Sequence, residues 1–148
     1  MGSLSRSELR EHIFKNVFCA GIRVDDPPKE YIDLYLEFTT DENEQRLELS
    51  AADSQYIKDK TMAVIEAKDS LDKLISEYAN DWSLNRLGKV ELAILRLSLY
   101  ELLYDDDIPE NVAINEAVEL SKKYGGEMTP GFVNGILSTA KKKAAENG

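Results

Sequence analysis

The stretch that decides the fold is residues 89–104, KVELAILRLSLYELLY. Placed on an α-helix, its apolar residues leave no polar face. Such a helix belongs at the centre of a bundle, because only there are all of its sides buried. We therefore expect an all-α protein built around residues 89–104.

Further helices are expected on the N-terminal side of this stretch. Residues 5–8, SRSE, have the form of a capping box, which predicts a first helix that begins there and stops at Gly21. The pair Pro27-Pro28 can open a second helix, and residues 39–50 are polar and form a loop. Apolar residues at helical spacing then predict one long helix over residues 51–80.

Around and after the central stretch, glycines and one proline mark the helix ends. Gly88 is expected as the C-cap of a short preceding element, and a helix ending at Tyr124 follows the central one. Thr129 and Pro130 suit the N-cap and first position of the last helix. Gly135, inside that helix, predicts the close approach of another helix. The total is six to seven helices in a single domain, residues 1–148.

The net charge of −10 is unevenly distributed. Residues 1–24 carry +2 and residues 120–148 carry +3, so residues 25–119 carry −15. If the two ends meet, a basic surface lies on an acidic body, which would attract a basic protein and repel non-specific RNA. The alternative is that the acidic surface serves only solubility.

The sequence offers no case for catalysis or for a metal. His12 and Cys19 are the single residues of their kinds, which excludes a Cys/His zinc site by count. They lie seven residues apart in one predicted helix, roughly 10 Å, too far for a nucleophile and its base. No phosphate-binding glycine motif, signal peptide or membrane span is recognised, so we expect a cytoplasmic protein without cofactor or small-molecule substrate.

Two features of the predicted helices indicate more than ordinary helix packing. Arg6 and Arg10 share one helix face, which Phe14 and Phe18 continue, and guanidinium groups with aromatic rings can hold single-stranded RNA. The alternative is that both rings are core and both arginines are surface residues. Arg96 lies within the apolar central helix, which predicts a buried ion pair or an interface.

From Leu87 onward the chain resembles the NusB family of transcription antitermination factors. Several uncommon clusters carry the resemblance, in the same order and spacing: GKVE at 88–91, AILRL at 93–97, YEL at 100–102, IP at 108–109, VAINEAVEL at 112–120, KYG at 123–125 and FVNGIL at 132–137. The strong match covers residues 84–138. The N-terminal half is similar only in helix pattern and length.

The resemblance implies a fold of two packed helical bundles, roughly residues 1–80 and 81–148. It implies a non-catalytic adaptor that pairs with ribosomal protein NusE. Together they would bind the single-stranded boxA element of nascent ribosomal RNA transcripts. The complex would help RNA polymerase to read through terminators. A basic ribosomal protein is also the partner that an acidic body would attract.

Site residues are expected on two surfaces. RNA binding is expected from the first and last helices meeting on one face, through Arg6, Arg10, Lys15, Phe18, Thr129 and Phe132. The N-terminal arginines are sparser than in many relatives, and Glu8 lies among them, so we expect weak RNA binding without NusE. The protein-partner site is expected at Asp81, Trp82 and Glu91, an acidic strip with an aromatic residue. The buried pair is expected between Arg96 and Glu116, with Glu101 as the second candidate partner.

Two other functions remain open at this point. The same helical fold forms the N-terminal domain of ribosomal RNA cytosine methyltransferases, although such an enzyme needs a further domain for its methyl donor. Because the N-terminal arginines are sparse, the chain could also be a NusE-binding protein that does not bind RNA itself.

Overall fold

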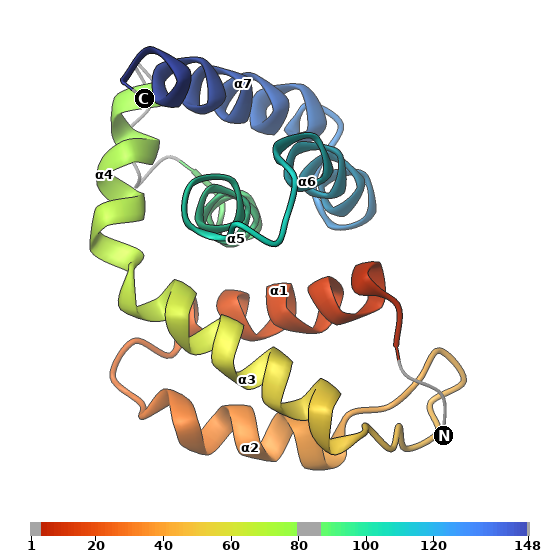
Figure 1. Cartoon of the computed structure of the whole chain (residues 1–148). Coiled ribbons are helices and arrows are strands. Elements are labelled where there is room, and N and C mark those ends of the chain that lie inside the picture. Colours follow the sequence, from red (N-terminus) through yellow and green to blue (C-terminus); the bar gives the residue numbers. More distant parts are fainter. Residues whose placement is uncertain (1–3, 80–86, 148) are drawn as a thin grey trace. The chain divides into compact units, whose positions relative to one another are not determined.

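The structure, a computed structural model, describes residues 4–79 and 87–147. Over these residues the chain is helical, apart from its loops and an isolated bridge between Thr40 and Arg46 (Figure 1). The helices are Arg6–Ile22 (α1), Pro28–Phe38 (α2), Ala51–Glu66 (α3), Lys68–Tyr78 (α4), Lys89–Tyr104 (α5), Glu110–Tyr124 (α6) and Thr129–Asn147 (α7). The all-α prediction is confirmed.

The chain divides into two compact units, residues 1–65 and 66–148, so the boundary falls earlier than the predicted one near residue 80. The long helix predicted over residues 51–80 is interrupted at Ala67, which is the N-cap of α4 with φ −89° and ψ 3°. Neither Gly nor Pro marks this interruption, and the apolar spacing continues across it. Helical period alone could therefore not detect it.

The first unit begins with the predicted capping box. The Ser5 hydroxyl accepts from the Glu8 N–H at 3.1 Å, and the Glu8 carboxylate accepts from the Ser5 N–H at 2.9 Å. These hydrogen bonds lower the pKa of Glu8. The helix continues through Gly21 to Ile22, so the glycine does not end it as predicted. Pro28 is the first residue of α2, as expected.

Polar contacts between its helices hold the first unit together around a buried apolar core. The Asp53 carboxylate of α3 accepts from the N–H of Leu4 at 2.9 Å, just before α1. Lys58 of α3 pairs with Asp33 of α2 at 2.8 Å. The fully buried core residues include Ile13, Ile32, Ile57 and Val64.

The second unit is built around α5, which packs against α4, α6 and α7 (Figure 1). Every residue from 92 to 99 is buried, as the absence of a polar face predicts. The hydroxyl of Ser98 donates to the Ile94 carbonyl at 2.7 Å, which satisfies a polar group inside the core. The prediction that this helix is central to its bundle is confirmed.

Two glycines of the second unit have roles other than those predicted. Gly88 is the N-cap of α5, with φ −69° and ψ 158°, and the short element predicted before it lies almost wholly in residues 80–86, outside the described residues. The prediction of a close helix at Gly135 is wrong, because a Cβ added there would meet nothing within 4 Å. The close approach occurs at Gly125, where a Cβ would lie 2.7 Å from the Cβ of Thr129.

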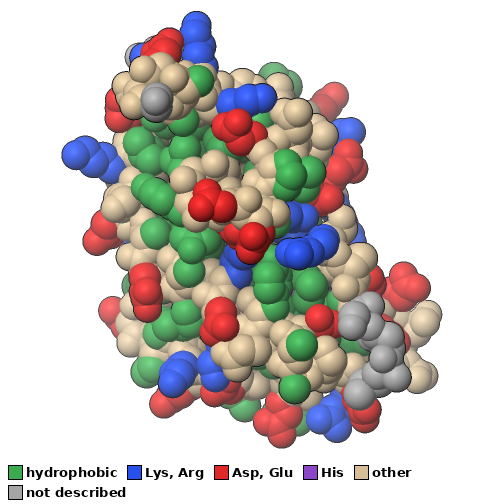
Figure 2. Space-filling view, in the orientation of Figure 1, with side chains coloured by type: hydrophobic (Ala, Val, Ile, Leu, Met, Phe, Trp, Pro, Cys, Tyr) green, Lys and Arg blue, Asp and Glu red, His purple; other side chains and the backbone are tan. Residues whose placement is uncertain are grey.

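On the face drawn in Figure 2, acidic, basic and hydrophobic side chains are interspersed. No helix in the described part of the chain is long and apolar enough to cross a membrane. A search of the same residues finds no cluster of three or more His, Cys, Asp or Glu side chains that could hold a metal ion.

Candidate nucleic-acid interface

A pocket of about 580 Å³ lies where the N-terminal turns of α5 and α7 meet, within the second unit. We call it the Glu91 pocket. From the side of α5 it is lined by Leu87, Gly88 and Glu91. From the side of α7 it is lined by Met128, Thr129, Gly131 and Phe132. It therefore brings together Thr129 and Phe132, predicted to bind RNA, and Glu91, predicted to bind a protein.

A chain of two hydrogen bonds fixes the wall of this pocket. The Gly126 N–H donates to the Thr129 hydroxyl at 3.0 Å, and that hydroxyl donates to the Glu91 carboxylate at 3.1 Å. Thr129 is only 5% exposed, so its single proton is committed to Glu91. The hydroxyl was predicted to cap α7, but it instead ties the loop before α7 to the first turn of α5.

Two glycines allow this arrangement. A Cβ added at Gly88 would collide with the Glu91 carboxylate, and one at Gly125 would collide with the Thr129 side chain. Gly88 therefore lets the carboxylate fold back toward the start of its own helix. There the positive end of the helix dipole favours a negative charge.

The composition of the pocket suits a nucleobase better than a phosphate. The Phe132 ring is half-buried and Met128 is 83% exposed, which together offer an apolar surface for a flat ring. The Glu91 carboxylate can accept from the amino or imino group of a base. The same negative charge disfavours a phosphate at that place.

In the first unit, Arg6 is the exposed guanidinium at the start of α1. It donates to the Tyr56 hydroxyl at 3.3 Å and lies 5.6 Å from the centre of that ring. A guanidinium that rests on an aromatic ring keeps its charge accessible at a defined position. Arg6 is therefore placed to meet a phosphate.

The other predicted RNA-binding residues of α1 are less accessible. Arg10 is only 4% exposed, so its guanidinium does not present itself to solvent. Lys15 and Phe18 are half-buried, and the Phe18 ring lies 6.4 Å from that of Phe14. Phe14 is buried, as the core interpretation of that ring expected. The meeting of α1 and α7 on one RNA face stays a prediction.

Of the predicted protein-partner site, the structure describes Glu91 alone. Asp81 and Trp82 lie outside the described residues. Gly88 and Gly131 also line the pocket and were not predicted as site residues. Glu91 and Thr129 are 38 positions apart, so no local pattern could join them.

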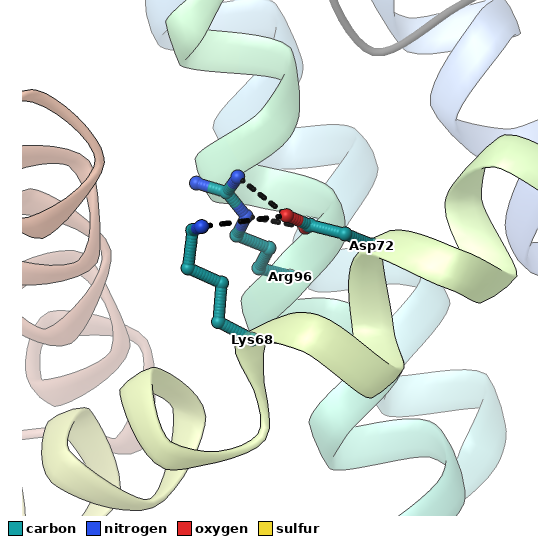
Figure 3. A network of polar contacts seen from close by, with 3 residues as sticks. All are labelled: Lys68, Asp72 and Arg96. Atoms are coloured by element: carbon teal, nitrogen blue, oxygen red, sulfur yellow. Dashed lines mark hydrogen bonds and ion pairs between the residues drawn. The ribbon is translucent and has the colours of Figure 1, made fainter.

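Arg96 is 8% exposed, and its carboxylate partner is Asp72 of α4 (Figure 3). Its Nε donates to Asp72 Oδ1 at 2.7 Å and its Nη2 to Oδ2 at 3.0 Å, a bidentate geometry. Lys68 lies 3.7 Å from the same carboxylate. The predicted partners, Glu116 and then Glu101, are therefore wrong. Glu116 was preferred because it lies on the helix that follows α5 in the chain, whereas Asp72 lies on α4, 24 positions before Arg96.

These features define an all-α protein of two helical units, with a surface pocket that joins the starts of two helices. The NusB family model matches residues 7–142, and the chain belongs to the NusB family. The transcription antitermination protein NusB of Agathobacter rectalis is 43% identical over 135 residues, covering 91% of this chain and 98% of that protein. NusB of Lachnoclostridium phytofermentans is 36% identical over 138 residues, covering 91% and 97%.

Solved structures agree with this assignment. Thermotoga maritima NusB superposes with a TM-score of 0.82 at 34% identity, covering 96% of this chain and 94% of that chain. A crystal structure of antitermination factors NusB and NusE in complex with dsRNA gives a TM-score of 0.77 at 26% identity, covering 93% and 96%. The predicted family is thus confirmed, and both halves of the chain share it.

Proposed function

We propose that this protein is a transcription antitermination factor that binds boxA-type single-stranded RNA together with ribosomal protein NusE. The observation that carries the proposal is the Glu91 pocket, in which an aromatic ring and a carboxylate acceptor face the same hollow. That pair suits an unstacked base, which is the form that single-stranded RNA presents. The related NusB that was crystallised with NusE and dsRNA supports NusE and an RNA as partners.

In this proposal the RNA is held by base contacts in the second unit and phosphate contacts in the first. Phe132 stacks on a base, and the carboxylate of Glu91 accepts a hydrogen bond from it. Arg6 meets a phosphate, and Lys15 adds positive charge from the same helix. The resulting complex lets RNA polymerase read through terminators in ribosomal RNA operons, in the cytoplasm.

The partner surface is proposed at Asp81, Trp82 and Glu91, on a chain whose net charge is −10. A basic ribosomal protein is attracted to such a surface, which raises the association rate more than it lowers the dissociation rate. Glu91 then serves both RNA and protein, and NusE and RNA meet at one place.

The test is a titration of labelled boxA-type RNA with this chain, with and without NusE. We expect NusE to tighten binding, and Phe132→Leu to weaken it by about 1–3 kcal/mol, because leucine keeps apolar volume and loses the stacking face. Circular dichroism of the variant checks that the half-buried position tolerates the change. Unaltered RNA affinity in a folded Phe132→Leu protein would overturn the base-stacking assignment.

The same titration separates the second candidate function, a NusE-binding protein without RNA contacts of its own. The burial of Arg10 favours that candidate, because it leaves Arg6 as the exposed arginine of the pair. In that case NusE would bind RNA equally well with and without this chain, and Phe132→Leu would have no effect.

A further inference from the structure

Two further hollows lie between α6 and α7, and the first of them borders the Glu91 pocket. The first, of about 440 Å³, shares Gly131 with the Glu91 pocket. The second, of about 550 Å³, shares Asn115 with the first. Together they form what we call the α6–α7 groove, which lies entirely within the second unit.

The residues of the groove recur at helical spacing along both helices. Its polar side chains include Asn111, Asn115, Lys122, Asn134, Ser138 and Lys142. The positions on α7 are separated by three or four residues, so they form one continuous face. From Gly131 to Ala145 this face extends about 21 Å along the helix.

The charge of the groove is positive on a chain that is acidic as a whole. Lys122, Lys141 and Lys142 line it, against the single carboxylate of Glu119. Glu119 pairs with Lys122 at 3.3 Å. Lys141 donates to the amide oxygen of Asn111 at 3.1 Å, a neutral partner that leaves the ammonium charge uncompensated. Two of the three lysines thus bring positive charge to the end of the groove away from Glu91.

The start of α7 leaves open space between the Glu91 pocket and the groove. Gly131 is the third residue of that helix. A Cβ at Gly131 would meet nothing within 4 Å, so packing within the protein does not require the glycine. It lines both the Glu91 pocket and the groove, so no side chain stands between the two at this position.

We propose that the α6–α7 groove is an extension of the RNA site, along which the strand continues beyond the Glu91 pocket. The inference rests on the proposed RNA-binding function. Lys141 and Lys142 meet phosphates at the far end of the groove, and the asparagine and serine side chains bond to sugar and base groups along it. The protein therefore covers a longer segment of RNA than the pocket alone accommodates.

The test compares two labelled RNAs in the presence of a fixed concentration of NusE. One is a boxA-type single strand of about 12 nucleotides. The other carries about six additional uridines at each end, and each extension has a length that a single-strand site can cover. We expect the wild-type chain to bind the extended RNA more tightly and with a steeper salt dependence. The double variant Lys141→Ala/Lys142→Ala should lower the salt slope for the extended RNA by about 1.4. It should leave binding of the short RNA unchanged.

Lys143→Ala is the matched control, because Lys143 is on the same helix, pairs with Glu146 at 3.9 Å and does not line the groove. The control should bind both RNAs like the wild type. Equal binding of the short and extended RNAs by the wild type overturns the groove and leaves the proposed function standing. If the double variant loses affinity equally for both RNAs, the groove is likewise overturned and the proposed function stands. If the wild type binds neither RNA, the proposed function fails and the groove with it.

Discussion

The hydroxyl of Thr129 donates to the carboxylate of Glu91 across 3.1 Å, and this bond joins the first turn of α7 to the first turn of α5. A hydrogen bond to a charged acceptor contributes about 1.5–3 kcal/mol. Thr129→Val, which keeps the shape and removes the donor, should therefore lower the free energy of unfolding by that amount, measured by urea denaturation. A stability loss well below 1 kcal/mol would show that the bond is not formed in solution.

Glu91→Gln separates the charge of Glu91 from its hydrogen bond. Glutamine keeps an acceptor for Thr129 but a neutral one, so we expect the stability to fall by about 1 kcal/mol. Removing the negative charge should slow association with NusE and make it less dependent on salt. Stopped-flow measurement of NusE association and thermal unfolding of the same variant distinguish the effect on binding from the effect on stability. A lowered melting temperature with unaltered NusE association would remove Glu91 from the protein-partner site.

Arg96→Met should destabilise the protein by about 3 kcal/mol or more, because it leaves the carboxylate of Asp72 poorly compensated at a site where its side chain is 14% exposed. Lys68→Met is the control. Lys68 is 41% exposed and lies 3.7 Å from the same carboxylate, so its loss should cost less than about 1 kcal/mol. Equal losses from the two substitutions would contradict the ranking of the partners.

Arg6→Ala should weaken RNA binding across sequences and reduce the salt slope by about 0.7, since one phosphate contact to a single strand is lost. Arg10→Ala should act differently. Because Arg10 is buried, its loss should reduce stability and leave the salt slope unchanged. Fluorescence anisotropy over a salt series, with unfolding curves for each variant, separates the two effects. A lower salt slope of RNA binding in both variants would show that Arg10 also contacts the RNA.

Gly135→Ala should stabilise the protein by about 1 kcal/mol, because alanine favours a helix interior and the added methyl group meets no atom. Gly125→Ala should do the opposite, since its Cβ would lie 2.7 Å from Thr129 and 2.8 Å from the Ser121 carbonyl oxygen. Melting temperatures of the two variants test the pair. A destabilised Gly135→Ala protein would show that another group approaches α7 there.

Stability should fall as the pH is lowered from about 7.5 toward 5.5, because burial lowers the pKa of His12. The ordinary pKa is near 6.5, so in this range the unfolded chain binds the proton and the folded chain resists it. Nδ1 of His12 lies 2.6 Å from the Tyr35 hydroxyl, and the neutral imidazole ring can form this hydrogen bond. In His12→Gln this part of the pH dependence should disappear from urea unfolding measurements. A similar pH dependence in the variant would assign it to other groups.

The sequence by itself determined the all-α class, the central position of residues 89–104 and the capping box at Ser5. Each of these follows from neighbours within one or two helical turns, where spacing and side-chain chemistry decide the outcome. It also indicated the family, because clusters such as VAINEAVEL at 112–120 keep their order and spacing. The interruption at Ala67 was not predictable, since no residue there disfavours a continued helix.

Only the tertiary structure decided which distant residues meet. Arg96 was correctly expected to be buried, but 24 positions separate it from Asp72, and no local pattern favoured Asp72 over Glu116 or Glu101. Glu91 and Thr129 were assigned to different surfaces, and the packing of α5 against α7 places them in one pocket. Helical periodicity states which side of each helix is buried. The choice of partner depends on how two helices are packed, and that is set by the sum of many weak contacts which no short stretch of sequence contains.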